Sequence, residues 1–410
     1  MFAIGFGLVC ASVCTLVHNY LSSLSSLSLS NSFLASCKKL RLYLEYGNDI
    51  ALPTINDEIT FDWGKRLLVH LPSGLPSAKF LEKREALAEA MRINPNRFHM
   101  RYDDGLIIDI VTADFPKMLP YRPSESTHSY RVFIGVNERG EARYYDFAGK
   151  YPHLLIGGIS GGGKSVMLRN ILTQLVTGPA PDLYLCDLKG GVELGIFRNL
   201  ACVKHLATEL SQVLIALNIV ESEMKRRYAA MLASGTQEWH GKRLIFVVDE
   251  LADFKTRAGD PDAKLKNEIK SVTTRLSAKG RAAGVIIVLA TQRPSADVVD
   301  GLIKTNIAAS ICFRTRDAVQ SRIVIDSDAA ANLPDIPGRL VWQTAFNETL
   351  QAPFISAADA RKLIAGLPQK GSENTEFVTV IIDKEDHQHE RHKYENSGEI
   401  RTLESNIIEL

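Results

Sequence analysis

Residues 158–165 of this 410-residue chain read Gly-Ile-Ser-Gly-Gly-Gly-Lys-Ser, a complete G-x-x-x-x-G-K-[ST] phosphate loop. The apolar residues 153–156 before it have strand character, and residues 166–176 after it have the apolar spacing of a helix. A glycine-rich turn between a strand and a helix lets backbone N–H groups surround a polyphosphate. The alternative is a purely structural turn, but the strand–loop–helix context favours an α/β fold with a nucleotide site.

The residue types in the loop predict its ligands. The loop consists of Gly158, Ile159, Ser160, Gly161, Gly162, Gly163, Lys164 and Ser165. Lys164 is expected to bind the β- and γ-phosphates, and the Ser165 hydroxyl is expected to bind Mg²⁺. The expected cofactors are therefore ATP and Mg²⁺.

A second motif is the apolar run at residues 244–248, which ends in Asp249 and Glu250. This Walker B arrangement places Asp249 to bind Mg²⁺ through water and Glu250 to polarise the attacking water. Apolar strands that end in acids are common, but this one follows the phosphate loop at a spacing that fits two βα units. The pair therefore predicts ATP hydrolysis, with Glu250 as a catalytic residue.

Residues 285–289 form the next apolar run, and residues 290–294 follow it as Ala-Thr-Gln-Arg-Pro. A polar side chain at such a strand tip can contact the γ-phosphate or the attacking water, and Gln292 is the candidate. A capping turn before a helix at residue 297 is the alternative.

Phosphoryl transfer is also favoured by a cation that meets the charge on the transferring group, and a neighbouring subunit can supply it. The candidates for this arginine finger are Arg275, Arg281, Arg293 and Arg322. The residue pattern alone does not choose among them.

Strand and helix patterns alternate over residues 151–355 and predict a motor domain with a parallel central sheet. The expected strands are 153–157, 183–187, 243–249, 285–290, 308–313 and 339–343, and the expected helices are 164–176, 207–234, 264–282 and 297–304.

The flanking segments differ from the motor in pattern. Residues 38–150 predict a small α+β module with strands at 66–71 and 106–111, a helix at 78–91 and a hairpin at 132–147. Its expected role is to dock or position the motor. Residues 356–410 predict a polar tail with one strand at 377–382, and its His387, His389 and His392 are not expected to form a metal site.

The N-terminal 37 residues contain no Lys, Arg, Asp or Glu. Residues 2–17 are apolar, residues 18–21 bring the run to about spanning length, and Lys38, Lys39 and Arg41 follow. The positive-inside rule predicts a membrane anchor over residues 1–37 with the motor in the cytoplasm. A cleaved signal peptide fits less well, because no basic residue precedes the apolar run. The Ser/Leu-rich residues 21–36 stay open as a second span, a linker or a surface segment.

The net charge of +1 indicates that any nucleic-acid surface is local or is built by assembling subunits. The six cysteines show no C-x-x-C pairing and are expected to be reduced and mostly buried.

Several motifs together resemble the FtsK/SpoIIIE family of DNA-translocating ATPases, over roughly residues 150–345. They are residues 152–158 before the phosphate loop, 247–253 around the acidic pair, 278–284, 289–304 and 317–326. The resemblance implies a RecA-like P-loop NTPase motor that assembles as a homo-hexamer around double-stranded DNA, bound without sequence specificity. It also implies that Gln292 is the γ-phosphate sensor and that Arg281 is the arginine finger, acting in trans, ahead of Arg275 and Arg322.

The departures from the family narrow the expected role. Chromosome-segregating members carry four membrane spans, a long linker and a C-terminal winged-helix module. For this sequence we expect one span or two, no long linker, and a tail too short and polar for that module. Residues 187–191, Asp-Leu-Lys-Gly-Gly, look more like the FtsK-like coupling proteins of conjugative elements. These bring a relaxase-bound strand to a secretion channel in the membrane. The alternatives are a chromosome or plasmid partition translocase, a protein-export ATPase and a nucleotide-binding scaffold without turnover.

Overall fold

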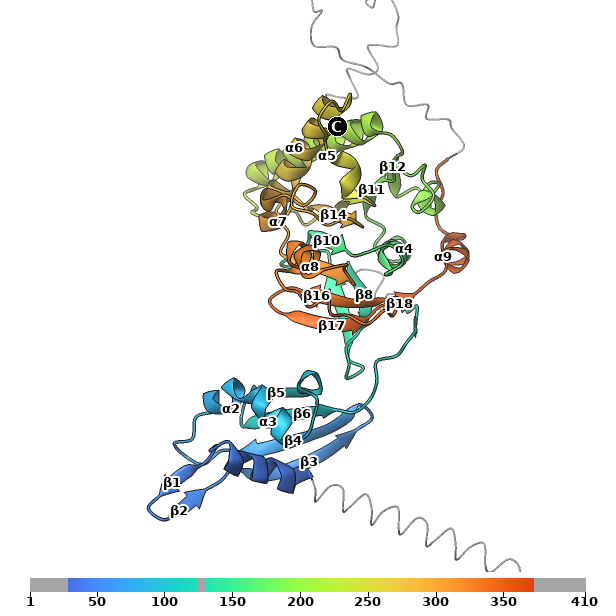
Figure 1. Cartoon of the computed structure of the whole chain (residues 1–410). Helices are drawn as coiled ribbons and strands as arrows, with labels where there is room; N and C mark the ends of the chain where they lie inside the picture. Colours follow the sequence, from blue (N-terminus) through green and yellow to red (C-terminus); the bar gives the residue numbers. More distant parts are fainter. Residues whose placement is uncertain (1–28, 124–129, 372–410) are drawn as a thin grey trace, which may run out of the picture. The chain divides into compact units, whose positions relative to one another are not determined.

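The computed structural model describes residues 29–123 and 130–371. They form a small α+β module, which ends near residue 115, and a larger α/β domain (Figure 1). Among these residues no helix is long and apolar enough to cross a membrane. The predicted span at residues 2–17 lies outside the described residues, as do the strand at 377–382 and His387, His389 and His392.

The larger domain is built on a ten-stranded sheet with the order β12-β11-β13-β14-β10-β15-β16-β17-β8-β9. Its parallel half consists of β12 (Val203–Ala207), β11 (Asp182–Cys186), β13 (Leu244–Val248), β14 (Val285–Thr291), β10 (Leu154–Gly157) and β15 (Ala309–Phe313). Its antiparallel half consists of β16 (Arg339–Gln343), β17 (Asn347–Gln351), β8 (Arg131–Val136) and β9 (Ala142–Asp146).

The sheet is therefore mixed, and the prediction of a parallel sheet is wrong for this second half. β16 and β17 are joined by only three residues, a connection that forces the two strands to run antiparallel. β8 and β9 form the predicted hairpin, but they extend the large sheet and do not belong to the small module.

Helices cover both faces of the parallel strands. α4 (Lys164–Thr177) and α9 (Ala357–Ile364) contribute to the core on one face, and α5 (Leu210–Ser234), α6 (Ala263–Lys279) and α8 (Ala318–Ile325) to the core on the other. In β13 the side chains of Ile245 and Val247 join the first core, while Phe246 and Val248 join the second. Burial on both faces explains why the central strands are continuously apolar.

The predicted strands and helices of the larger domain are present with shifted ends. α5 starts at Leu210, because Val203–Ala207 is the strand β12, which the sequence analysis missed together with α8. The helix expected at 297–304 is α7 (Gly301–Asn306), which begins after Asp300 caps the N–H of Ile303 (2.8 Å).

The larger domain also begins earlier and ends later than the sequence predicts. Gly135 of β8 lies so close to β17 that a Cβ there would be 2.3 Å from the Gln351 carbonyl oxygen. At the other end, Ala360 and Ile364 of α9 are buried although they lie in the predicted tail. The larger domain thus runs from about residue 119, in β7 (Leu119–Pro120), to the β-bridge at Gln369, and not from 151 to 355.

The small module is a four-stranded antiparallel sheet in the order β3-β4-β6-β5. Its elements are a helix at 29–39, the hairpin β1 (Leu44–Tyr46) and β2 (Asp49–Ala51), β3 (Thr54–Phe61), β4 (Gly64–His70), α2 (Ala78–Glu82), α3 (Arg84–Ala90), β5 (Phe98–Tyr102) and β6 (Leu106–Val111). The helix predicted at 78–91 is interrupted at Lys83. Phe33 and Cys37 are fully buried in this core, so the module begins before the predicted residue 38.

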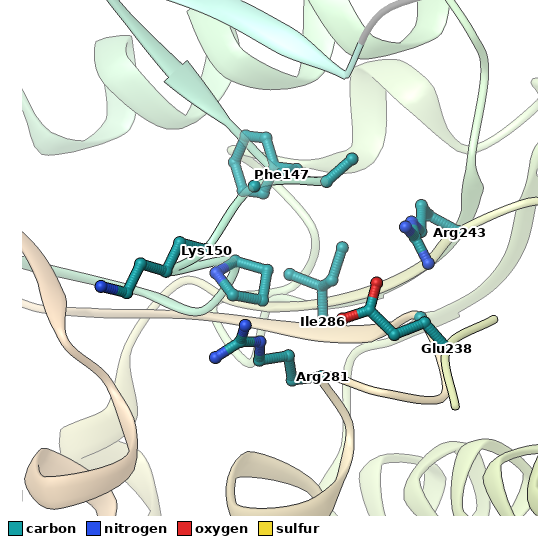
Figure 2. A pocket seen from close by; sticks show the side chains of 10 residues that line it. Phe147, Lys150, Glu238, Arg243, Arg281 and Ile286 are labelled. Carbon is teal, nitrogen blue, oxygen red and sulfur yellow. The ribbon is translucent and has the colours of Figure 1, made fainter. Parts of the chain in front are cut away.

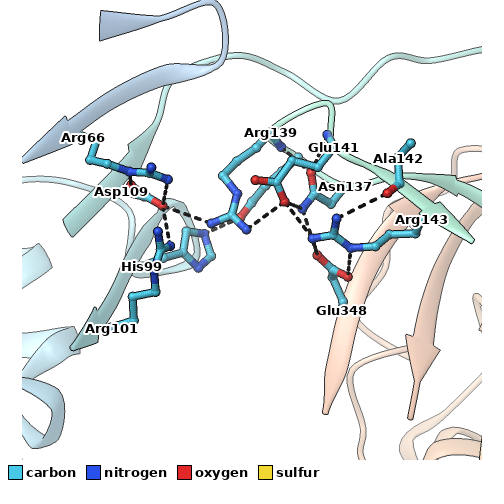
Figure 3. Close-up of polar contacts among 11 residues, drawn as sticks. Arg66, His99, Arg101, Asp109, Asn137, Arg139, Glu141, Ala142, Arg143 and Glu348 are labelled. Carbon is cyan, nitrogen blue, oxygen red and sulfur yellow. Dashed lines mark hydrogen bonds and ion pairs between the residues drawn. The ribbon is translucent and has the colours of Figure 1, made fainter. Parts of the chain in front are cut away.

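Charged side chains of the two parts form the ion pairs drawn in Figure 3. In the small module Arg66 binds Asp109 (2.6 Å), and Arg139 of the β8–β9 turn also reaches Asp109 (3.1 Å). In the larger domain Arg143 bridges Glu141 and Glu348 (2.7 Å each). Burial alone would raise the pKa of Glu141, but hydrogen bonds from Arg143 and Asn137 and the charge of Arg139 lower it to about 2. These pairs stabilise the ionised form of Glu141.

Candidate nucleotide-hydrolysis site

The phosphate loop follows β10 at the carboxyl edge of the sheet. Gly158, Gly161 and Gly163 have φ angles of 143°, 83° and 124°, which side chains with a Cβ rarely adopt. A Cβ at Gly158 would lie 2.6 Å from Cβ of Phe313, and one at Gly163 would lie 2.9 Å from Cε1 of the same ring. The loop therefore rests on Phe313 of β15, and glycine is required by both conformation and space.

Helix α4 begins at Lys164 without a side-chain cap, because its N-cap residue is Gly163. Its first-turn N–H groups and the positive end of its dipole consequently remain for an anion. Ile159 N–H donates to the Arg314 carbonyl and Gly338 N–H donates to the Gly162 carbonyl (2.9 Å each). These bonds hold the loop open, and the arrangement fits a polyphosphate.

Lys164 and Asp249 form a buried ion pair. The Nζ atom of Lys164 lies 2.9 Å from Oδ1 of Asp249 and also donates to the Asp249 backbone carbonyl. Both side chains are almost fully buried. The structure thus brings together the phosphate-binding lysine and the metal-binding carboxylate that the sequence predicts. Ser165 follows Lys164 in the first turn of α4.

Glu250 is held in one orientation by the tip of β14. Its Oε1 accepts hydrogen bonds from Thr291 Oγ1 (2.7 Å) and from the Gln292 backbone N–H (3.1 Å), and Oε2 accepts from the same N–H (3.1 Å). Thr291 is a contact that the sequence analysis did not single out. The sequence could have indicated this contact, because Thr291 is the last residue of the strand that precedes Gln292 and so lies at the same sheet edge.

The strand order explains why the phosphate loop, the acidic pair and the tip of β14 lie close together. β14 pairs with both β10 and β13, so the strand that Gln292 follows lies between the strands that lead to the phosphate loop and to the acidic pair. The carboxyl ends of parallel neighbours meet at one sheet edge. The backbone of Gln292 therefore lies beside the acidic pair, and its role as a γ-phosphate sensor stays a prediction.

Lys189 is a site residue for which the sequence analysis gave no role. It follows β11 and contacts Asp249 and Glu250 from the solvent side. The sequence did contain a signal for this residue. An acid, Asp187, follows the apolar strand β11 just as Asp249 follows β13, and Lys189 comes two residues later.

Arg281 lies at the opposite edge of the sheet. It precedes β14, whose seven residues separate the two edges by about 20 Å at roughly 3.3 Å a residue. It lines a cavity of about 240 Å³, and Lys150, Glu238 and Arg243 line the same cavity (Figure 2). Within the described residues its side chain takes part in no hydrogen bond or ion pair. Arg281 therefore cannot reach the phosphate loop of its own chain.

The other arginine candidates have different surroundings. Arg275 of α6 is bound to Glu221 of α5 (2.6 Å) and so serves helix packing. Arg293 and Arg322 are exposed, Arg293 directly after Gln292 and Arg322 in α8.

The convergence of the phosphate loop, the acidic pair and the intervening strand tip at one sheet edge defines a P-loop NTPase. Residues 122–243 match the FtsK/SpoIIIE family. With this match and the likenesses below, the chain is an FtsK/SpoIIIE-family ATPase, and ATP binding follows from that membership.

Relatives of known name share the domain. A protein from Lactiplantibacillus plantarum named DNA translocase FtsK is 30% identical over 302 residues, which is 68% of this chain and 37% of the relative. The chain thus spans about a third of the length of the curated relatives it matches.

Solved structures share the fold as well. The pCW3 conjugation coupling protein TcpA, solved in its monomer form with ATPγS, superposes with a TM-score of 0.57 at 25% identity over 82% of this chain and 98% of that one. The type VII secretion ATPase EccC of Thermomonospora curvata gives a TM-score of 0.51 at 23% identity, over 63% of this chain and 34% of EccC, and shares the fold alone.

Proposed function

We propose that this chain is a membrane-anchored, ATP-driven DNA translocase that couples conjugative DNA transfer to a secretion channel. The observation that carries the proposal is the extent of the likeness to the coupling protein TcpA, which covers 98% of that chain and 82% of this one. The translocases named FtsK are covered over about a third of their length. A likeness that spans nearly all of the coupling protein supports the coupling role over the role of the longer translocases.

The chemistry follows from the site. Lys164 and the N–H groups of the phosphate loop bind the triphosphate, and Ser165 and Asp249 bind Mg²⁺, which offsets charge on the phosphates. Glu250, held by Thr291 and the Gln292 N–H, orients and deprotonates the attacking water, and the Gln292 side chain senses the γ-phosphate.

The position of Arg281 supports a ring in which neighbouring subunits complete the site. An exposed cation about 20 Å from its own phosphate loop stabilises transferred charge only on a nucleotide bound elsewhere. We infer a homo-hexamer with double-stranded DNA in its channel, gripped through phosphates without sequence readout. Such a ring builds a basic lining from subunits whose own charge is near zero.

The DNA motor is tested by steady-state ATP hydrolysis of the full chain in mild detergent, with and without double- and single-stranded DNA. We expect DNA to stimulate hydrolysis several-fold, and Glu250→Gln to abolish turnover while nucleotide still binds. Hydrolysis that is insensitive to both DNA forms would contradict the proposal and would favour a protein-export ATPase.

The 30% identity to a translocase named FtsK keeps chromosome or plasmid partition as the second candidate. A donor strain carrying Glu250→Gln separates the two. We expect DNA transfer to recipients to fall by orders of magnitude while growth and nucleoid segregation stay normal. Normal transfer with disturbed segregation would support partition instead.

A further inference from the structure

A second lysine, Lys189, contacts both carboxylates of the hydrolytic pair. Its Nζ lies 3.3 Å from Oδ2 of Asp249 and 3.8 Å from Oε2 of Glu250. The side chain is 43% exposed, whereas that of Lys164 is 3% exposed. Asp249 is thus held on one oxygen by a buried lysine and on the other by a lysine that faces solvent.

The turn that carries Lys189 has a fixed conformation. The fully buried Asp187 accepts backbone N–H bonds from Lys189 (3.2 Å), Glu193 (2.9 Å) and Leu194 (3.0 Å). Gly190 and Gly191 follow with φ angles of 75° and 73°, a left-handed conformation that residues with a Cβ rarely adopt. The fixed conformation of this turn therefore holds Lys189 next to Asp249 and Glu250.

The two lysines have different tasks once a nucleotide binds. Lys164 must leave Asp249 to meet the phosphates, since one ammonium cannot serve both a buried carboxylate and a triphosphate equally. If Lys189 were absent, Asp249 and Glu250 would then face the incoming polyanion without a cation at short range. Lys189 is the remaining cation in contact with them in the described structure.

We propose that Lys189 is a positioning residue of the nucleotide site, which holds and neutralises Asp249 and Glu250 while Lys164 moves from Asp249 to the phosphates. The inference rests on the proposed function, because it assigns Lys189 a part in ATP hydrolysis. Bound Mg²⁺ supplies positive charge at the same carboxylates, so the need for Lys189 in nucleotide binding is greatest without the metal.

The test measures the affinity of the full chain for a fluorescent ATP analogue, once with EDTA and once with excess Mg²⁺. For Lys189→Met we expect about tenfold weaker binding in EDTA and less than about threefold in Mg²⁺, because the metal replaces the lost charge. Lys189→Arg should retain affinity. In Mg²⁺ the Met variant should lose kcat far more than KM rises, because Glu250 loses one of the contacts that position it.

Lys204→Met is the matched control, since Lys204 is 45% exposed and pairs with Asp182 (3.6 Å) away from the site. It should bind and hydrolyse nucleotide like the wild type. Wild-type affinity of Lys189→Met in EDTA would overturn the inference, and so would an equal loss with and without Mg²⁺, which would indicate a structural role. If the wild-type chain bound no nucleotide, the proposed function itself would fail.

Discussion

At the scale of single residues, the site in this structure is held together by an ion pair that must open when a nucleotide binds. Lys164 is bound to Asp249, and both are almost completely buried. The phosphate-loop motif predicts only that Lys164 binds phosphates. The structure adds that, without nucleotide, the same lysine neutralises a carboxylate that is out of reach of water.

Lys164→Ala should therefore affect stability as well as nucleotide binding. Removing Lys164 leaves the buried Asp249 with only the half-exposed Lys189 as a cation partner, and we expect the free energy of unfolding to fall by about 3 kcal/mol. Lys164→Ala/Asp249→Asn should recover most of this loss, because the remaining side chain is neutral. The measurement is urea unfolding without nucleotide.

The exposed pair of Lys204 and Asp182 provides the control for this prediction. Lys204→Ala should change the free energy of unfolding by less than about 1 kcal/mol. If Lys164→Ala and Lys204→Ala destabilise the chain equally, the buried pair does not have the stabilising role that we assign to it.

At the scale of elements, β10 and β14 set the geometry of the site. Their pairing places the phosphate loop beside Thr291, and β14 separates this edge from Arg281. His153, directly before β10, adds a bond to the pairing, because its Nδ1 accepts the backbone N–H of Ile287 (3.1 Å). Burial, together with the charge of Arg281, lowers the pKa of this histidine to about 4.

A pH dependence of stability follows from His153. The folded state keeps the ring neutral, so protons bind more readily to the unfolded chain between its ordinary pKa of 6.5 and about 4. Stability is therefore complete above pH 6.5 and falls as the pH falls, by about 2 kcal/mol between pH 7.5 and 5 from this group alone.

Urea unfolding at the two pH values measures the effect. His153→Asn, which keeps an acceptor near Ile287, should show a loss on acidification smaller by about 2 kcal/mol. The exposed His70→Asn serves as the control and should show the wild-type loss. An unchanged pH dependence in His153→Asn would rule out this histidine as its source.

At the scale of the whole molecule, the two edges of the sheet carry complementary parts of one proposed reaction. The carboxyl edge holds the phosphate loop and the acidic pair, and the amino edge holds Arg281 in its cavity. One chain cannot close the distance between them. A ring in which the amino edge of one subunit meets the carboxyl edge of the next would unite them.

Mixing two variants tests this arrangement. Arg281→Ala should bind ATP but lose turnover by about 10³-fold or more, as removal of an arginine finger does. Mixed with Glu250→Gln, it should regain part of the activity, because some interfaces then join an intact Arg281 to an intact Glu250. ATPase rate is measured against the mixing ratio, after both variants are shown to assemble as the wild type does. Absence of recovery would count against Arg281 as a finger in trans.

The sequence by itself determined the parallel half of the fold and the core of the site. Strands such as β13 and β14 are buried on both faces and so are apolar throughout, and a phosphate loop needs glycines with a lysine and a hydroxyl at fixed positions. These signals are local, and for that reason Lys164, Asp249, Glu250 and Gln292 could be named before their geometry was known.

Only the tertiary structure decided the rest. The hairpin β8–β9 has the same local pattern whichever sheet it joins, and its pairing with β17 is made with a strand more than 200 residues away in the chain. Asp249, the partner of Lys189, is likewise sixty residues distant, directly after β13, which only the sheet order brings near. Local patterns are set by backbone geometry and burial, whereas contacts between distant segments depend on how the whole chain packs.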